Sequence, residues 1–268
     1  MIKIIAIDID ETLLTNQHQL LPSTIEAIHE AHTQGIKVVL CSGRPLAGLL
    51  PWLKQLGIDG PDEYVVTYNG GIVQSVAGEI ISKHLLDNAT YRRLSEFAQL
   101  HDVPFNVLDD ESNIYTSSHD VNWVIVQQAA ENTAGLYIRT PDELPADFAI
   151  TKGLFVGDAK RLDAIQPAVE RDFDDCYVVR AGQLFLEVMH ADVNKGAGLQ
   201  ALAQALNVTA EQVMAIGDEG NDIAMFDYAG CAVAMGNGSD EAKAHADHVV
   251  ATNDDGGVAE AIRNFALN

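Results

Sequence analysis

The sequence predicts an α/β fold, in which a doubly wound parallel sheet is interrupted by an inserted α+β domain. The apolar run Ile2–Ile7 is typical of a strand buried on both faces of a parallel sheet. Helical and strand patterns then alternate with short loops, as in doubly wound sheets. The middle of the chain instead places strands next to one another, and the alternation returns after it. We therefore expect a core of residues 1–83 and 191–268, with an inserted domain at 84–190.

The first part of the core contains clear boundary signals. Ser23 and Glu26 have the spacing of a capping box, which predicts a helix that ends near Gly35. A strand at 36–41 and a helix at 45–56 follow, and Pro51 predicts a kink or a late start in that helix. Strands at 64–68 and 72–75 flank the turn Asn69-Gly70-Gly71.

The middle and last parts of the chain differ in the order of their predicted helices and strands. In the middle, helices are expected at 90–101, 121–132 and 159–173, and strands at 105–108, 113–116, 149–156, 176–180 and 184–189. Neighbouring strands of this kind predict an antiparallel sheet. In the last part, a helix at 197–206 and strands at 213–216, 231–234 and 249–250 alternate with helices that end near 229, 242 and 267.

Composition excludes several classes of partner. The net charge of −23 argues against nucleic acid or an anionic membrane as a partner. The longest apolar runs are strand-sized, so we expect no membrane span, and the start at Met1 leads directly into a strand, so we expect no signal peptide. Three widely spaced cysteines favour a reducing compartment. We expect a cytoplasmic protein; the sequence does not indicate its oligomeric state.

Polar side chains follow strands or open helices at four places in the predicted core. Each is weak alone, because an aspartate after a strand is more often a turn or cap residue, and a lone lysine is usually solvated. Together they would lie at one edge of the sheet, since ligands bind at the carboxyl ends of parallel strands. The residues concerned are Asp8, Asp10, Thr12, Ser42, Lys195, Asp218, Asn221 and Asp222.

Carboxylates gathered at one sheet edge need a cation. Asp8, Asp10 and Asp218 would repel one another, and hard oxygen ligands suit Mg²⁺. Lys195 and the hydroxyl groups of Thr12 and Ser42 would then hold the phosphoryl oxygens, and backbone N–H groups of the first loop could add donors. The pattern therefore predicts a metal-assisted site for a phosphorylated small molecule.

Four motifs in order resemble those of the haloacid dehalogenase-like hydrolase superfamily. They are Asp8-x-Asp10-x-Thr12, Ser42-Gly43-Arg44, Asn194-Lys195-Gly196 and Gly217-Asp218-x-x-Asn221-Asp222. The Pro after Arg44, the turn Tyr68-Asn69-Gly70 and the large insertion before Lys195 resemble the Cof-type sugar-phosphate phosphatases over nearly the whole chain. The resemblance implies a Rossmann-like core with an inserted cap domain of the larger C2 type.

The resemblance also implies roles for individual residues. Asp8 would be the nucleophile that forms an aspartyl-phosphate, and Asp10 the general acid and base. Lys195 would stabilise Asp8 and the charge that develops on phosphorus. Mg²⁺ would be held by Asp8, Asp218 and the carbonyl group of Asp10. Phosphate would be bound by Thr12, Ser42, Gly43 and Asn221, with Arg44, Asn69 and Asp222 supporting them or the substrate.

The sequence departs from this family at Glu11, where glycine is usual. Glycine suits unusual backbone angles, and we expect here an intact loop with Glu11 pointing outward. Side chains of the cap should select the substrate. His119, Lys152 and His190 are candidates, although a surface or loop hydrogen-bonding role is the simpler interpretation of each.

The expected activity is Mg²⁺-dependent hydrolysis of small phosphate esters, with sugar phosphates as the favoured class. A phospho-accepting receiver module shares an acidic cluster, a hydroxyl group and a lysine, but has about half this length and no insertion. A phosphomutase would use the same chemistry; mutases of this superfamily usually have smaller helical caps. The sequence leaves the physiological substrate open.

Overall fold

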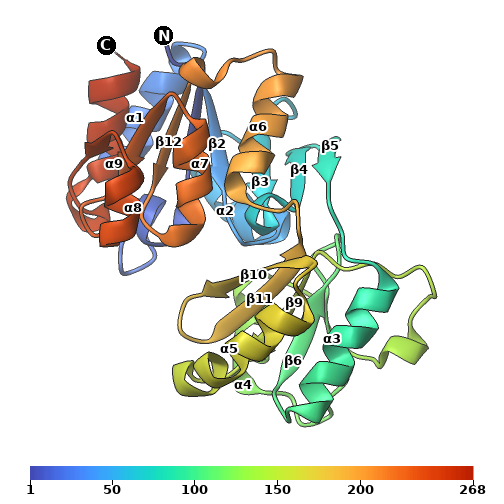
Figure 1. Cartoon of the computed structure of the whole chain (residues 1–268). Helices are drawn as coiled ribbons and strands as arrows, with labels where there is room; N and C mark the ends of the chain where they lie inside the picture. Colours follow the sequence, from blue (N-terminus) through green and yellow to red (C-terminus); the bar gives the residue numbers. More distant parts are fainter. Residues whose placement is uncertain (268) are drawn as a thin grey trace. The chain divides into compact units, whose positions relative to one another are not determined.

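The chain forms two compact units in a computed structural model that describes residues 1–267 (Figure 1). One unit contains Met1–Lys83 and the segment from Asn194 onward. The other is the continuous segment His84–Val193. We refer to them as the discontinuous unit and the continuous unit. Residues 1–267 contain no helix long and apolar enough to cross a membrane.

The discontinuous unit is built on an eight-stranded sheet in the order β14-β13-β12-β1-β2-β3-β4-β5. The strands from β14 to β3 are parallel, and β4 and β5 continue the sheet as an antiparallel edge. The strands are β1 (Ile4–Ile7), β2 (Lys37–Cys41), β3 (Tyr64–Thr67), β4 (Ile72–Ser75), β5 (Ile80–Lys83), β12 (Val213–Gly217), β13 (Cys231–Ala234) and β14 (His248–Val249).

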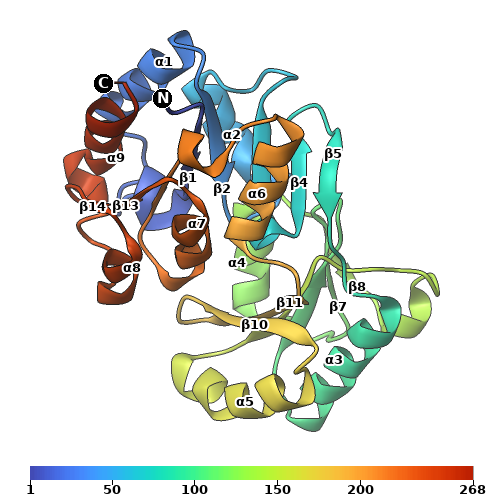
Figure 2. The same cartoon turned by 45° about the horizontal axis from the view of Figure 1, so that its top comes forward.

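Helices cover both faces of this sheet (Figures 1 and 2). Alternate residues of β1 point to opposite faces, so Ile5 and Ile7 belong to one apolar cluster while Ile4 and Ala6 belong to the other. The first face carries α1 (Pro22–Thr33), α2 (Leu46–Leu56) and α9 (Gly257–Ala261), and the second carries α6 (Lys195–Ala205), α7 (Ile223–Tyr228) and α8 (Asp240–His245). The predicted doubly wound α/β fold is therefore confirmed.

Two local predictions for this unit were wrong, and one strand was not predicted. The first helix starts at Pro22 without a side-chain cap, so Ser23 lies inside its first turn and does not form the predicted capping box with Glu26. The second helix does not start late, because it begins at Leu46 and continues through Pro51, its sixth residue, where proline removes one hydrogen bond of the helix. The edge strand β5 was not predicted, because its short, partly exposed segment gives a weak pattern.

The continuous unit has a six-stranded sheet in the order β10-β11-β9-β6-β7-β8. Its strands are β6 (Phe105–Leu108), β7 (Ile114–Thr116), β8 (Leu136–Ile138), β9 (Lys152–Val156), β10 (Cys176–Ala181) and β11 (Phe185–His190). All pairs are antiparallel except β7 with β8, so the sheet is mixed and not wholly antiparallel as expected. The three-residue strand β8 was too short to predict.

One face of this second sheet carries an aromatic core. Phe105 and Phe155 of the sheet pack with Phe97 of α3 (Asn88–Leu100) and with Leu162 of α5 (Ala159–Asp172). On the opposite face, Asn106 donates a hydrogen bond to Gln128 of α4 (Trp123–Glu131) at 3.0 Å. The division of the chain at residues 84 and 193 is a property of the packing; that the continuous unit acts as a cap stays a prediction.

Candidate active site

The first aspartate lies where the central strand of the sheet ends. Strand β1 is paired on one side with β12 and on the other with β2, and the backbone N–H of Asp8 continues this pairing to the carbonyl group of Ile216 at 2.9 Å. The chain then turns at once, because the N–H of Leu13 donates to the carbonyl group of Asp8 at 3.2 Å. The side chain of Asp8 is thereby fixed at the carboxyl edge of the sheet.

A buried lysine contacts this aspartate from a helix start. Asn194 caps α6 by accepting a hydrogen bond from the N–H of Ala197, and Lys195 is the first residue of the helix. The Lys195 side chain is wholly buried, and its ammonium group donates hydrogen bonds to Asp8 and, at 2.6 Å, to Asp222. A buried charge of this kind requires such partners.

Asp222 joins the lysine to the loop after β12. One of its carboxylate oxygens accepts from Lys195, and the other accepts from the backbone N–H groups of Asp218 at 2.9 Å and Glu219 at 3.1 Å. Both carboxylate oxygens of Asp222 therefore accept hydrogen bonds from the protein. It orders both the lysine and the loop that carries Asp218.

Asp218 completes the buried acidic group. Thr12 donates its hydroxyl hydrogen to Asp218 at 2.6 Å, and the hydroxyl group is buried with it. Carboxylate oxygens of Asp8, Asp218 and Asp222 all lie within 4.8 Å of one another. Burial, against the hydrogen bond from Thr12 and with the repulsion of Asp222, raises the pKa of Asp218 to about 7.

The charges of the group are not balanced. Burial raises the pKa of Asp8 well above its ordinary value, against the attraction of Lys195, and the neighbouring acids Asp222 and Asp218 raise it further. Burial lowers the pKa of Lys195, but Asp222 and Asp8 raise it more, so its ammonium group stays charged. With all three carboxylates ionised, one ammonium group would leave two negative charges in a buried place.

The side chain of Asp10 lies apart from the buried acidic group of Asp8, Asp218 and Asp222. Its carboxylate accepts two hydrogen bonds from Arg44, at 2.6 and 3.0 Å, and is about half exposed. The guanidinium group forms a two-point clamp of the kind that arginine makes with carboxylates. The predicted residues Asp8 and Asp218 are thus brought together, whereas the carboxylate of Asp10 is held elsewhere by Arg44.

A second hydrogen-bonded set lies at the ends of β2 and β3. The N–H of Asn69 donates to the carbonyl group of Ser42 at 2.9 Å, and Asn221 donates its side-chain amide to Asn69 at 3.3 Å. Gly43 lies against Asn69, since a β-carbon at Gly43 would come within 3.3 Å of the Asn69 amide. The Ser42 hydroxyl accepts from the N–H of Arg44 at 3.1 Å.

Sequence reasoning missed a turn that supports both aspartate loops. Gly236-Asn237-Gly238 is not among the predicted site residues, yet Asn237 donates its side-chain amide to the carbonyl group of Glu11 at 2.8 Å. The N–H of Ser239 donates to the carbonyl group of Asp218 at 2.9 Å. The available signal was that this turn follows β13, another strand that ends at the same edge.

Glu11 has the backbone conformation that glycine favours. Its φ is 61° and ψ is 6°, which is the left-handed region. The side chain is exposed, in agreement with the expectation that it points outward. The loop is intact, and the bond from Asn237 to the Glu11 carbonyl group helps to hold this uncommon conformation.

Lys152, a candidate substrate-selecting residue, has a partner within the continuous unit. Its ammonium group donates to Glu187 at 2.5 Å, and both side chains are buried. His119 is exposed. Neither observation assigns these residues to a substrate.

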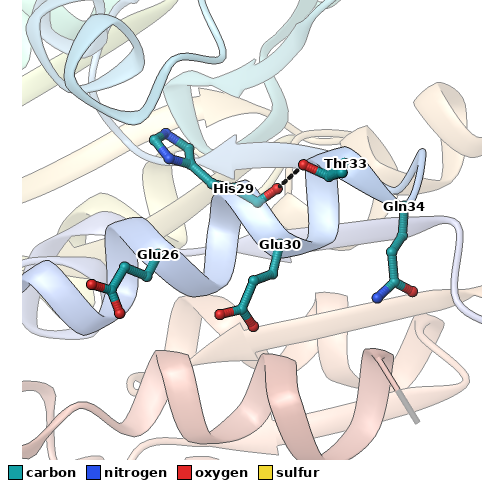
Figure 3. Close-up of a pocket in the computed structure, with 5 residues that line it drawn as sticks. All are labelled: Glu26, His29, Glu30, Thr33 and Gln34. Carbon is teal, nitrogen blue, oxygen red and sulfur yellow. Dashed lines mark hydrogen bonds between the residues drawn. The ribbon is translucent and has the colours of Figure 1, made fainter.

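An open hollow of about 500 Å³ lies on the surface of α1 (Figure 3). It is lined by Glu26, His29, Glu30, Thr33 and Gln34. None of these is a predicted site residue, and the end of α1 leads into the start of β2, at the opposite edge of a parallel sheet. The hollow therefore has no connection with the acidic group.

Known proteins resemble this chain over nearly its whole length. A model of the haloacid dehalogenase-like hydrolase family matches residues 5–262. YxeH of Bacillus subtilis, named as a candidate phosphatase, is 34% identical over 100% of this chain and 99% of its own. A 5-amino-6-(5-phospho-D-ribitylamino)uracil phosphatase of the same organism, YitU, is 28% identical over 98% of this chain and 97% of its own.

A solved structure gives the same relationship. The crystal structure of a haloacid dehalogenase-like hydrolase from Bacteroides thetaiotaomicron has a TM-score of 0.86 and 31% identity, covering 98% of this chain and 99% of that one. The match of fold, length and sequence confirms the resemblance drawn from the four motifs. The chain belongs to the haloacid dehalogenase-like hydrolase family and is a hydrolase of that family.

Proposed function

We propose that the protein is a Mg²⁺-dependent phosphatase of small phosphorylated metabolites, with sugar phosphates as the favoured class, which works through an aspartyl-phosphate. The observation that carries the proposal is the buried contact of Asp8 with Lys195, beside Asp218. A carboxylate held by a buried ammonium group is oriented for attack and is matched to an anionic substrate.

The residues present fit a divalent cation. When its three carboxylates are ionised the buried group has two negative charges in excess, and its donors are hard carboxylate oxygens, which suit Mg²⁺. Because Asp222 already accepts three hydrogen bonds, Asp8, Asp218 and the carbonyl group of Asp10 are the better ligands. When bound, the ion would neutralise phosphoryl oxygens and help to align them with Asp8.

The protein groups divide the reaction between them. A carboxylate oxygen of Asp8 attacks phosphorus in line while the bond from phosphorus to the ester oxygen breaks. Lys195 compensates the charge on the phosphoryl group, and Thr12, Ser42, Gly43 and Asn221 bind its oxygens. Water then attacks phosphorus, phosphate leaves, and Asp8 is regenerated.

Asp10 supplies the proton for the leaving oxygen and later accepts a proton from the attacking water. In the structure, Asp10 is clamped by Arg44, whose backbone N–H is fixed by Ser42. Asp10 must therefore exchange Arg44 for the ester oxygen before it donates. Arg44 is in this view a positioning residue, and Asn69 and Asp222 support the loops around it.

The relatives support the reaction and the substrate class. YxeH and YitU bear phosphatase names, and the substrate in the name of YitU is a phosphorylated ribityl compound. The inserted continuous unit is proposed to act as a cap that selects the leaving group. The three cysteines, all free, support the proposal of a reducing, cytoplasmic compartment. The charge of −23 disfavours nucleic acid as a partner.

The proposal is tested by phosphate release from a panel of sugar phosphates, nucleotides and vitamin phosphates, each with Mg²⁺ and with chelator. We expect turnover that requires Mg²⁺ and a higher kcat/KM for sugar phosphates than for nucleotides. Trapping of ³²P on the wild type but not on Asp8→Asn checks the covalent intermediate. Turnover that persists in chelator, or labelling that survives in Asp8→Asn, contradicts the mechanism.

A further inference from the structure

Two histidines and an aspartate come together where the chain enters and leaves the continuous unit. His84 is the first residue of this unit, while His190 ends β11 and Asp192 follows two residues later. Ligand atoms of all three side chains lie within 4.8 Å of one another. Because His84 and His190 are far apart along the chain, this grouping could not be recognised from the sequence.

The local structure holds this cluster in place. The rings of His84 and His190 are 5.5 Å apart between centroids and tilted by 39°. A tight turn at the end of β11 brings Asp192 back, since the N–H of Val193 donates to the carbonyl group of His190 at 2.9 Å. A carboxylate oxygen of Asp192 lies 3.7 Å from Nδ1 of His190.

We propose that His84, His190 and Asp192 form a binding site for a transition-metal dication, with Zn²⁺ as the representative ion. Two imidazole groups and one carboxylate are a donor set suited to Zn²⁺ and its neighbours, in contrast to the all-oxygen group around Asp8. The side chain of His190 is 39% exposed and that of Asp192 is 72% exposed, so an ion can reach them. Water would fill the remaining position.

The site requires only small movements. Ligand atoms around a tetrahedral Zn²⁺ are about 3.4 Å apart, so the three side chains must close by about one ångström, which rotation of exposed side chains allows. The N–H of Asp192 donates to Nδ1 of His190 at 3.3 Å, so Nδ1 carries a lone pair, and a metal that binds Nδ1 takes the place of this hydrogen bond.

A bound ion would join the two ends of the continuous unit. Residues 84 and 190 are separated by the whole of that unit in sequence, so the metal closes a long loop and disfavours the unfolded chain. The site shares no residue with the proposed phosphatase centre. Failure of one proposal therefore leaves the other untouched.

Zn²⁺ titration by calorimetry in excess Mg²⁺ tests the site in the full-length protein. We expect one Zn²⁺ per chain in the wild type, and binding weakened at least about tenfold in His84→Asn and in His190→Asn, since even indirect partners of a ligand contribute that much. His245→Asn is the matched control, because His245 pairs with Asp227 at 3.0 Å at similar exposure but belongs to no group of three metal-ligand residues among residues 1–267. Wild-type affinity in both variants, or equal loss in His245→Asn, overturns the site.

A spectroscopic measurement covers the case in which a variant fails to fold. With one equivalent of Cu²⁺ on the wild type, electron paramagnetic resonance should show coupling to two imidazole nitrogens. A spectrum with oxygen ligands alone, as the Asp8 group would give, overturns the site. Zn²⁺ should also raise the melting temperature of the wild type and not that of His84→Asn; an equal rise in both counts against the proposal.

Discussion

At the scale of single residues, the site is organised by the buried ammonium group of Lys195. It contacts Asp8 and Asp222, and through Asp222 it is linked to the backbone of the loop that carries Asp218. Asp8, Lys195 and the loop that carries Asp218 are thus positioned by one connected set of hydrogen bonds. Substitution of any one of these residues should therefore have an effect on stability that is coupled to the others.

Asp8→Asn tests the nucleophile. The amide still offers an oxygen to Lys195, so the fold should persist, but it cannot attack phosphorus. We expect kcat to fall at least about a thousandfold, with a melting temperature equal to or above that of the wild type, because one buried charge has been removed. Substantial residual turnover would exclude Asp8 as the nucleophile.

Lys195→Met tests the buried pair as a stabilising element. Removing the ammonium group leaves Asp8 and Asp222 buried without a countercharge, which should lower the free energy of unfolding by about 3–5 kcal/mol. Lys160→Met, at an exposed position, should change it by less than about 0.5 kcal/mol. Urea denaturation measures both, and equal effects would contradict the buried-pair argument.

At the scale of elements, the site depends on two local features of the backbone. The loop after β1 holds Glu11 in a left-handed conformation, at φ 61°. The start of α6 packs so closely on α7 that a β-carbon at Gly196 would lie 2.1 Å from the carbonyl oxygen of Ala224. The left-handed conformation of Glu11 is strained, and the close packing at Gly196 leaves no room for a side chain there.

Glu11→Gly should stabilise the protein. Left-handed angles cost an ordinary residue about 1–2 kcal/mol. Glycine avoids this cost, but part of the gain in stability is lost because glycine has more conformational freedom in the unfolded chain. We expect a net gain of about 0.5–1 kcal/mol in chemical denaturation. Glu11→Ala removes the same charge but keeps the β-carbon, so a gain of equal size in Glu11→Ala would assign the effect to charge.

Gly196→Ala should displace the start of α6, and with it Lys195. We expect a lower melting temperature and at least about a tenfold loss of kcat, since Lys195 is proposed to act in catalysis and small displacements of a catalytic group are costly. Gly60→Ala is the control, because its β-carbon would meet its nearest neighbour at an ordinary 3.8 Å. Wild-type kinetics in Gly196→Ala would show that α6 can move without consequence.

At the scale of the whole molecule, a chain with a charge of −23 concentrates three carboxylates in one buried group. Such an arrangement opposes folding at neutral pH unless a cation is bound. Metal binding and folding should therefore be coupled. The pKa of Asp218, raised to about 7, gives this coupling a definite pH range.

In chelator, stability should fall as pH rises from about 4 to about 7. The folded state keeps a proton on Asp218 that the unfolded chain has released, so the unfolded state binds fewer protons across this range. The loss from this group is at most about 4 kcal/mol. Mg²⁺ should restore stability above pH 7, and Asp218→Asn should show a shallower fall; identical profiles would contradict the assignment. Thermal unfolding measures all three.

The features of this protein that could be predicted are those that depend on local patterns of residues in the sequence. The apolar run that becomes β1 is buried on both faces because a central parallel strand has no solvent side, and this let the sheet be predicted. The short strands β5 and β8 escaped prediction, since three or four partly exposed residues carry little periodic signal. The start of α1 was wrong because Pro22 occupies the first helical position, one residue before the expected cap Ser23.

The sequence by itself determined the α/β fold class, the family and the residue types available for chemistry, because these follow from hydrophobic periodicity and from short motifs. Only the tertiary structure decided the pairings: Lys195 with Asp8 and Asp222, Arg44 with Asp10, and His84 with His190. The two partners of Lys195 lie 187 residues (Asp8) and 27 residues (Asp222) away from it in the sequence. Such contacts depend on which strands are neighbours and where helices begin, which is fixed when the sheet packs and not by any local stretch of chain.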